Sequence, residues 1–166
     1  MNHLQPEFDR DAHESILNRA IEISRAALSV PGATPFGALV VIDGEVVAEG
    51  MSLVIHKHDP TAHAEVEAIR TAAMRKGNHL LVDATLYCSS EPCPLCLMAC
   101  YWAEIPTVIF AAHTTDVARH GFRDLTYYQQ LKLATPERYI SEVTATDDFR
   151  VRAVDVLDKW REIHRE

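Results

Sequence analysis

Two short motifs carry most of the information in this chain: His63-Ala64-Glu65 and, further along, Pro92-Cys93-Pro94-Leu95-Cys96. One histidine and two cysteines supply three ligands that zinc prefers, which leaves the fourth tetrahedral position for water. Structural zinc sites are normally closed by four protein ligands, whereas catalytic sites use three. Glu65 can sit beside such a water without being a ligand, where a proton carrier is needed. The pattern therefore predicts a catalytic Zn²⁺ site formed by His63, Cys93 and Cys96, with Glu65 as the catalytic residue.

The remaining cysteines allow a second interpretation of this region. Four cysteines lie between positions 88 and 100, and such clustering in a chain of cytosolic character indicates metal binding rather than disulfides. Cys88, Cys93 and Cys96 also have the spacing of plant-type iron–sulfur ligands. That arrangement needs Cys100 as its fourth ligand and leaves His63 and Glu65 without a role. We therefore expect Cys88 and Cys100 to be small buried core residues.

Length, composition and charge limit the classes of function. The 166 residues, 48% of them hydrophobic, can fill one core and predict a single domain over residues 1–166. No apolar run approaches the roughly 18 residues of a membrane span. The polar start, Met1 to Glu14, does not resemble a secretory signal, so we expect a cytoplasmic protein. The formal net charge of −8 argues against a nucleic-acid partner.

Hydrophobic periodicity and turn residues predict the order of the helices and strands. Helices are expected over residues 13–28, 63–76, 94–102, 124–133 and 149–164. Strands are expected over residues 37–42, 45–48, 84–88 and 107–112, and a fifth over 139–143. Asp43-Gly44 joins the first two strands as a hairpin turn. This order predicts a three-layer α/β/α domain with a mixed five-stranded sheet, an initial antiparallel hairpin, and parallel strands after it.

The motifs also resemble a known family. The H-x-E and P-C-x-x-C pair is the signature of zinc-dependent nucleobase deaminases, and the chain resembles the cytidine-deaminase-like superfamily, in particular its guanine deaminase branch. The resemblance is carried by Pro35-Phe36-Gly37-Ala38, Asp43-Gly44, Asp59-Pro60-Thr61-Ala62-His63-Ala64-Glu65-Val66, Glu91-Pro92-Cys93-Pro94-Leu95-Cys96, Tyr101-Trp102-Ala103 and Gly121-Phe122-Arg123-Asp124. The last two motifs are more similar to guanine deaminases than to tRNA adenosine deaminases.

The resemblance implies roles for several further residues. It implies that Phe36 and Trp102 pack on the base and that Asp124 helps to read the purine edge. It also implies a homodimer in which a C-terminal helical segment, about residues 135–166, covers the partner's site. One position departs from the family pattern, because Ser52 stands where the family usually has an Asn that bonds the base. A Ser hydroxyl lacks the paired donor and acceptor of a carboxamide, so the identity of the base stays open.

These observations favour a zinc-dependent hydrolase that releases ammonia from a free nucleobase, with guanine or a related amino-heterocycle as its small-molecule substrate. Bound zinc lowers the pKa of water to about 7, and one carboxylate can take the proton from water and pass it to the leaving nitrogen. Three alternatives stay open. They are a tRNA adenosine deaminase, a deaminase of a triazine, pyrimidine or nucleoside, and a protein whose zinc is purely structural.

Overall fold

The computed structural model describes residues 9–164 of the chain. The described residues form two compact units, one up to Gln129 and one from Gln130 onward. The expectation for the start of the chain falls largely on residues 1–8, which lie outside the described residues. The first unit contains the following elements, the last of which continues into the second unit: α1 (Arg10–Ala26), η1 (Ala27–Ser29), β1 (Thr34–Ile42), β2 (Glu45–Ser52), α2 (Val54–Lys57), α3 (Ala64–Lys76), β3 (Ala84–Ser90), α4 (Pro94–Trp102), β4 (Thr107–Ala112), α5 (Thr114–Arg119) and α6 (Asp124–Leu131).

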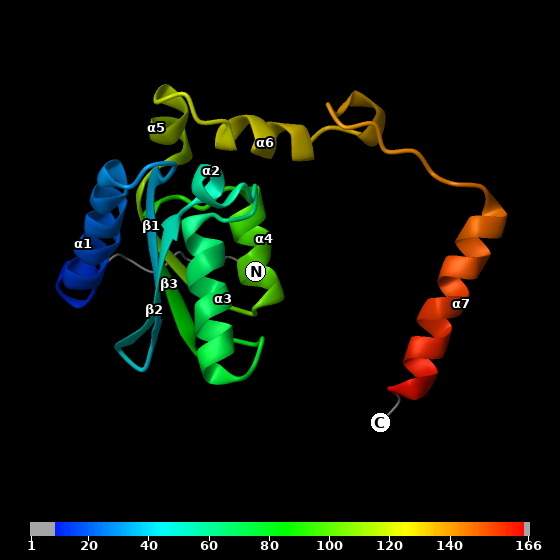
Figure 1. Ribbon diagram of the computed structural model, residues 1–166, viewed down its shortest axis with the longest axis horizontal. Helices are drawn as coiled ribbons and strands as arrows, with labels where there is room; N and C mark the ends of the chain where they lie inside the picture. The colour runs from blue at the N-terminus through cyan, green and yellow to red at the C-terminus, as the bar shows by residue number, and fades with distance from the viewer. Residues whose placement is uncertain (1–8, 165–166) are drawn as a thin grey trace. The chain divides into compact units, whose positions relative to one another are not determined.

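The sheet is mixed and has four strands in the order β2-β1-β3-β4 (Figure 1). Strand β1 pairs antiparallel with both β2 and β3, and Ile42 faces Glu45 across the turn that joins β1 to β2. Strands β3 and β4 are parallel, as expected, because α4 carries the chain from the end of one to the start of the other.

The prediction of a fifth strand over residues 139–143 is wrong. In the second unit, η2 (Thr135–Glu137) is followed by irregular chain that leads to α7 (Asp147–Ile163). A strand needs a neighbour to pair its backbone groups, and the described part of this unit offers no other strand. The backbone N–H of Tyr139 instead donates to the side-chain Oε1 of Gln130 at 2.7 Å. Among residues 9–164 the sheet therefore has four strands rather than five.

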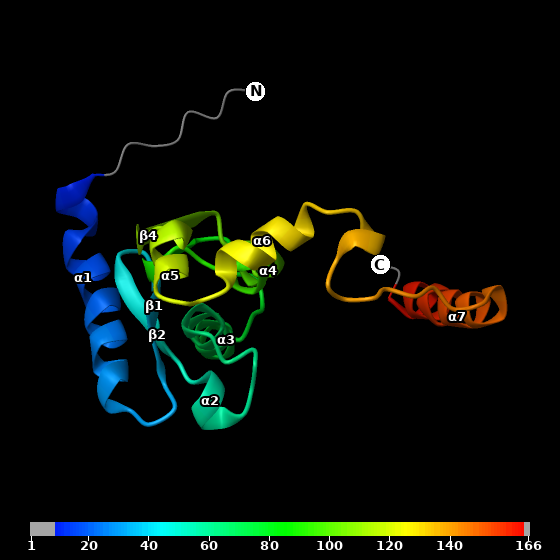
Figure 2. The same ribbon diagram turned by 90° about the horizontal axis from the view of Figure 1, so that it is seen from above.

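Helices cover the two faces of the sheet. Helix α1 lies along one face, and α3 and α4 lie on the other (Figures 1 and 2). Each face has its own buried apolar cluster, with Leu39 and Tyr87 on the α1 side and Val40 and Leu86 on the α3 side. The alternation of neighbouring residues between the faces follows from the two-residue period of a strand.

Glycines let the helices approach the sheet closely. A Cβ added at Gly50 in β2 would lie 2.0 Å from the backbone oxygen of Ala64 in α3. A Cβ added at Gly37 in β1 would lie 2.3 Å from the backbone oxygen of Ala20 in α1. Gly50 therefore fixes how near the first turn of α3 comes to the sheet.

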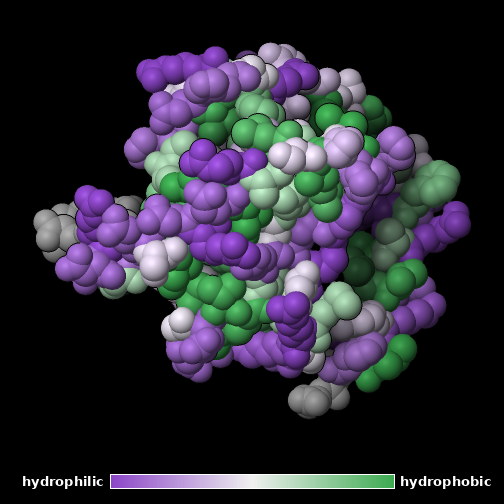
Figure 3. Space-filling model, turned by 60° about the vertical axis from the view of Figure 1, so that its left-hand side comes forward, coloured by the Kyte–Doolittle hydropathy of each residue, from purple (hydrophilic) through white to green (hydrophobic). Residues whose placement is uncertain are grey.

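Helix α7 exposes much of its apolar surface. Its exposed apolar side chains include Phe149, Val156, Leu157, Trp160 and Ile163. Hydrophilic and hydrophobic residues are interspersed on the face of the molecule in Figure 3. Over residues 9–164, no helix combines the length and the hydropathy that crossing a membrane requires.

Candidate active site

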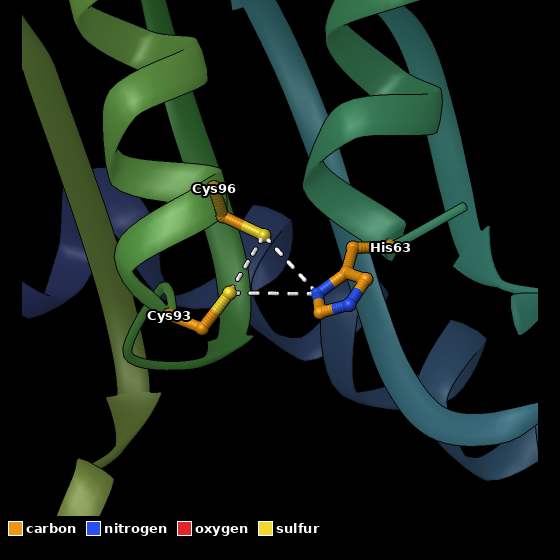
Figure 4. A group of neighbouring side chains, drawn as sticks. All are labelled: His63, Cys93 and Cys96. Atoms are coloured by element: carbon orange, nitrogen blue, oxygen red, sulfur yellow. Dashed lines mark hydrogen bonds between the residues drawn. The ribbon is translucent and has the colours of Figure 1, made fainter. Parts of the chain in front are cut away.

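The side chains of His63, Cys93 and Cys96 converge between the first turns of α3 and α4 (Figure 4). The Nδ1 atom of His63 lies 3.5 Å from Sγ of Cys93 and 3.4 Å from Sγ of Cys96. The two sulfur atoms are 3.5 Å apart. Residues 30 and 33 positions apart along the chain are thus brought into one group of three candidate ligand atoms, as the sequence motifs predict.

These distances match the edges of a zinc coordination tetrahedron. Zn–S bonds of about 2.3 Å and Zn–N bonds of about 2.05 Å place neighbouring sulfur and nitrogen ligands about 3.6 Å apart, and two sulfurs about 3.8 Å apart. The observed triangle is within a few tenths of an ångström of these values. The donor set of one imidazole and two thiols also suits zinc. His63, Cys93 and Cys96 therefore fit a zinc ion in both spacing and chemistry.

Local sequence explains why two of these ligands lie at helix ends. His63 is the N-cap of α3 and Cys93 is the N-cap of α4, with Pro94 at the first helical position. Before α3, the carboxylate of Asp59 accepts bonds from the backbone N–H and the hydroxyl of Thr61, which closes a tight turn. The positive ends of both helices point toward the ligand group and favour thiolates there.

Glu65 lies beside the ligand group without belonging to it. Its side chain is 5% exposed, and its Oε2 atom lies 3.3 Å from Sγ of Cys96. Burial raises the pKa of Glu65 to about 7, because removing the carboxylate from water disfavours its charged form. A carboxyl group with a pKa near neutrality can both accept and donate a proton at physiological pH.

The thiols share the charge of the site unequally. The pKa of Cys93 lies well below its ordinary value, because its sulfur shares a hydrogen bond with that of Cys96 and His63 lies beside it. The pKa of Cys96 is raised, because the hydrogen bond between the two sulfurs and burial both oppose a second negative charge. A bound metal cation would instead favour the thiolate form of both cysteines, since a coordinated thiol is deprotonated.

A cavity of about 360 Å³ opens onto this group. Its size falls in the range of about 300–1,000 Å³ that small-molecule sites occupy. Phe36 and Phe122 form an aromatic part of the wall, with ring centroids 4.7 Å apart in an edge-to-face arrangement. The cavity is lined by the following residues: Thr34, Phe36, Ser52, Val54, Ile55, His63, Ala64, Glu65, Ser90, Cys93, Gly121, Phe122, Arg123, Asp124 and Tyr127.

The cavity brings together most of the residues that the sequence singles out. Phe36, Ser52 and Asp124 line it together with His63, Glu65 and Cys93, and burial raises the pKa of Asp124. Trp102 does not line it, because its side chain is 81% exposed at the end of α4. A base-packing role for Trp102 therefore stays a prediction.

Sequence reasoning missed several of the lining residues. Phe122 lies within the Gly-Phe-x-Asp motif, so its aromatic character next to Asp124 is a signal that could have identified it. Thr34 has no such signal, because its position depends on the register between β1 and β2.

Two hydrogen bonds attach the α5–α6 segment to the loop before α4. The Tyr128 hydroxyl donates to the backbone oxygen of Pro92 at 2.7 Å. The Glu91 carboxylate accepts from the backbone N–H of Thr114 at 2.7 Å. Because Pro92 precedes Cys93 and Tyr128 is on the helix that Asp124 begins, these bonds connect the loop that holds Cys93 to the Asp124 side of the cavity.

Comparison with known proteins places this geometry in a family. A family model, described as the cytidine and deoxycytidylate deaminase zinc-binding region, matches residues 10–112, a span that contains Glu65 and all three candidate metal ligands. The chain belongs to this deaminase family. The resemblance that the motifs indicate is thereby confirmed, and with it a zinc-binding domain in which His63, Cys93 and Cys96 could hold the ion.

Within the deaminase family, the chain is a homologue of guanine deaminase. It is 44% identical over 137 residues to a guanine deaminase of Bacillus subtilis, a match that covers 81% of this chain and 88% of that protein. An X-ray structure of the Bacillus subtilis guanine deaminase covers 93% of this chain and 96% of its own, with a TM-score of 0.86 and 39% identity. A tRNA-specific adenosine deaminase of Haemophilus influenzae is more distant, at 36% identity over 72% of this chain and 67% of that protein.

Proposed function

We propose that this protein is a zinc-dependent aminohydrolase that converts the amino group of a free nucleobase, guanine or a related amino-heterocycle, into ammonia. The observation that carries the proposal is the buried carboxylate of Glu65 beside the His63, Cys93 and Cys96 group, at the base of a cavity of about 360 Å³. The similarity to guanine deaminase over most of the chain supports the same reaction.

Metal binding and proton transfer in such a reaction would fall to different residues of the chain. His63, Cys93 and Cys96 would hold zinc, which when bound activates a water molecule for attack on the ring carbon. Glu65 accepts the proton of that water and passes it to the departing nitrogen, because ammonia leaves more readily than an amide anion.

Other residues of the cavity bind and orient the base. The aromatic wall of Phe36 and Phe122 provides apolar surface for a flat ring. Asp124 provides an acceptor for an N–H group, and its partly buried position makes an unpaired carboxylate there unfavourable. Ser52 contributes a hydroxyl in place of the family's usual carboxamide.

A buried glutamate distinguishes this proposal from a purely structural zinc site. A structural site gains nothing from a buried carboxylate that is not a ligand, and burying it is costly. A tRNA substrate is disfavoured by the net charge of −8, because phosphate binding requires basic surface.

The proposal is tested by ammonia release across a panel of guanine, adenine, cytosine, isocytosine, aminated triazines and pterins, together with their nucleosides. We expect measurable activity with guanine and loss of nearly all of it in the Glu65→Gln variant. Replacing Asp124 with Ala should lower activity on every base that presents an N–H edge. Activity on a tRNA anticodon stem-loop alone, falling steeply with added salt, would favour the tRNA alternative instead.

The quaternary arrangement and location of the protein are a second part of the proposal. We infer a cytoplasmic homodimer built from one deaminase domain per chain, in which the C-terminal helical segment covers the partner's site. The exposed apolar residues of α7 support this arrangement, because an unpartnered stripe of Leu157, Trp160 and Ile163 is unfavourable in water. Light scattering should give a dimer mass, and Trp160→Asp should weaken the dimer.

Subunit mixing tests whether the segment acts on the partner's site. Glu65→Gln lacks the proton carrier, whereas Trp160→Asp retains it. If the C-terminal segment of one subunit completes the other's site, Trp160→Asp should also lose activity, and mixing the two variants should restore part of it. Recovery of none, with mixed dimers present, would contradict an exchanged segment.

A further inference from the structure

Two hydroxyl groups face one another at the open end of the β1–β2 hairpin. Thr34 is the first residue of β1 and Ser52 the last of β2, and the two are partners in the antiparallel register. Thr34 Oγ1 donates a hydrogen bond to Ser52 Oγ at 2.6 Å. Both residues line the same cavity as Glu65 and Asp124. The hydroxyl pair is therefore part of the wall that a bound base would contact.

Ser52 has few ways to satisfy its hydroxyl. Its side chain is 3% exposed, so bulk water does not reach it freely. Among residues 9–164, the Ser52 hydroxyl forms its hydrogen bond with Thr34. Thr34 itself is half-buried. The free hydrogen and lone pair of Ser52 are thus available to whatever occupies the cavity.

A pair of hydroxyls differs from a carboxamide in that its polarity can reverse. Each hydroxyl has one hydrogen and two lone pairs, and it rotates to suit its neighbours. If the base presents an acceptor, Thr34 donates to Ser52 and Ser52 donates to the base. If the base presents a donor, Ser52 accepts from the base and turns its own hydrogen toward Thr34. Thr34 is needed in the second case, because otherwise the Ser52 hydrogen would be buried without an acceptor.

We propose that Thr34 is a specificity-determining residue that, with Ser52, forms a reversible hydroxyl pair. The pair allows the cavity to bind purines that present either a carbonyl or an amino group toward the end of the hairpin. The substrate class then includes 2,6-diaminopurines as well as 2-amino-6-oxopurines such as guanine. This inference rests on the proposed function, since it concerns the base that the same cavity binds.

The test measures binding in a background that does not turn over the base. In Glu65→Gln protein loaded with zinc, dissociation constants are measured for guanine and 2,6-diaminopurine, and for 7-deazaguanine and 9-deazaguanine. The first pair exchanges a carbonyl for an amino group, and the second moves an N–H between ring positions. In at least one pair, one purine presents a hydrogen-bond donor toward Ser52. We expect Thr34→Val to weaken binding of that purine by about tenfold relative to the other member of the pair, as loss of one buried hydrogen-bond partner implies.

Two further variants separate this role from a structural one. Thr34→Ser keeps the hydroxyl and should preserve the parent ratios in both pairs. Thr107→Val makes the same change at an exposed threonine of β4, outside the cavity, and should also leave them unchanged. If both ratios in Thr34→Val equal those of the parent, or if Thr34→Ser behaves as Thr34→Val does, the hydroxyl pair does not read the base. Failure of the proposed function would look different, because the parent protein would then release ammonia from none of these purines.

Discussion

Glu65 and Cys96 come from different helices, yet Oε2 of Glu65 lies 3.3 Å from Sγ of Cys96, and both residues are buried. Two groups that can each carry a negative charge are thus buried side by side, beside a third such group, Cys93. Buried like charges are unfavourable unless a cation balances them. The arrangement is consistent with a site whose charges balance when a divalent metal is bound.

The metal site can be tested with a pair of cysteine variants. We expect the purified protein to contain about one zinc per chain, and Cys93→Ala to lose it because only two ligands remain. Cys88→Ala should keep the metal, because Cys88 is buried in the sheet core, and should cost about 1–2 kcal/mol of stability. Elemental analysis and thermal unfolding measure both effects. Iron with acid-labile sulfide in the parent protein would instead support the iron–sulfur interpretation.

The role of Glu65 predicts a variant that is folded but inactive. Glu65→Gln replaces the carboxylate with an amide of similar shape that cannot carry a proton. It should retain zinc while kcat falls by at least about 10²-fold, the low end of typical acid–base contributions. Steady-state ammonia release measures the change. Turnover close to that of the parent would show that another group transfers the proton.

The raised pKa of Glu65 predicts a spectroscopic change when zinc is added. Burial raises this pKa to about 7 in the metal-free protein, so the carboxyl should be largely protonated at pH 6 and ionised at pH 8. A cation nearby favours the charged form and should shift the pKa downward. Infrared difference spectra, with Glu65→Gln to identify the band, report the protonated carboxyl. At pH 6 its band should weaken on zinc addition, and an unchanged band would argue that the ion binds elsewhere.

Gly50 predicts an effect on catalysis from a residue outside the cavity. A Cβ there would lie 2.0 Å from the Ala64 backbone oxygen, so Gly50→Ala must displace the first turn of α3. We expect a loss of about 1–3 kcal/mol in stability, typical of overpacking, together with a reduced kcat because Glu65 moves with that turn. Gly44→Asn, in the hairpin turn where added atoms meet open space, should leave kcat unchanged. Equal effects of the two substitutions on kcat would mean that the position of α3 does not affect catalysis.

Substitution at Ser52 should change which base is preferred. Ser52→Asn introduces a fixed donor and acceptor into the cavity wall and should shift kcat/KM toward guanine within the panel. The shift should be about tenfold, because a mismatched buried polar group costs roughly 1–3 kcal/mol. If the order of substrates stays the same, Ser52 does not contact the base.

Much of the site could be predicted from sequence because its residues follow local rules. Pro94 sets the start of a helix and the C-x-x-C spacing puts two thiols on one turn, so the bounds Pro94–Trp102 follow from sequence alone. Glu65 follows from its place next to His63 on a new helix. The short helix α5 was missed, although the sequence places the acidic Asp116 three residues after His113, where its carboxylate accepts a bond from the His113 backbone N–H.

Features that depend on long-range pairing could not be predicted. The contact between Thr34 and Ser52 requires the register of two strands, which a one-residue slip would destroy. Residues 139–143 have strand-like composition, but composition does not supply a neighbouring strand. The exposure of Trp102 likewise depends on which elements cover the end of α4.

The bonds from Tyr128 to Pro92 and from Thr114 to Glu91 have a thermodynamic consequence. They attach the Asp124 side of the cavity to the loop that holds Cys93. Ordering of either segment on ligand binding should therefore favour ordering of the other. Linkage requires such an effect to be reciprocal: if zinc tightens binding of the base, the base must tighten retention of zinc by the same factor. A saturating base should therefore raise the chelator concentration that removes half of the zinc, and Tyr128→Phe should reduce that protection. A bound substrate would thus increase the affinity of the protein for the zinc ion.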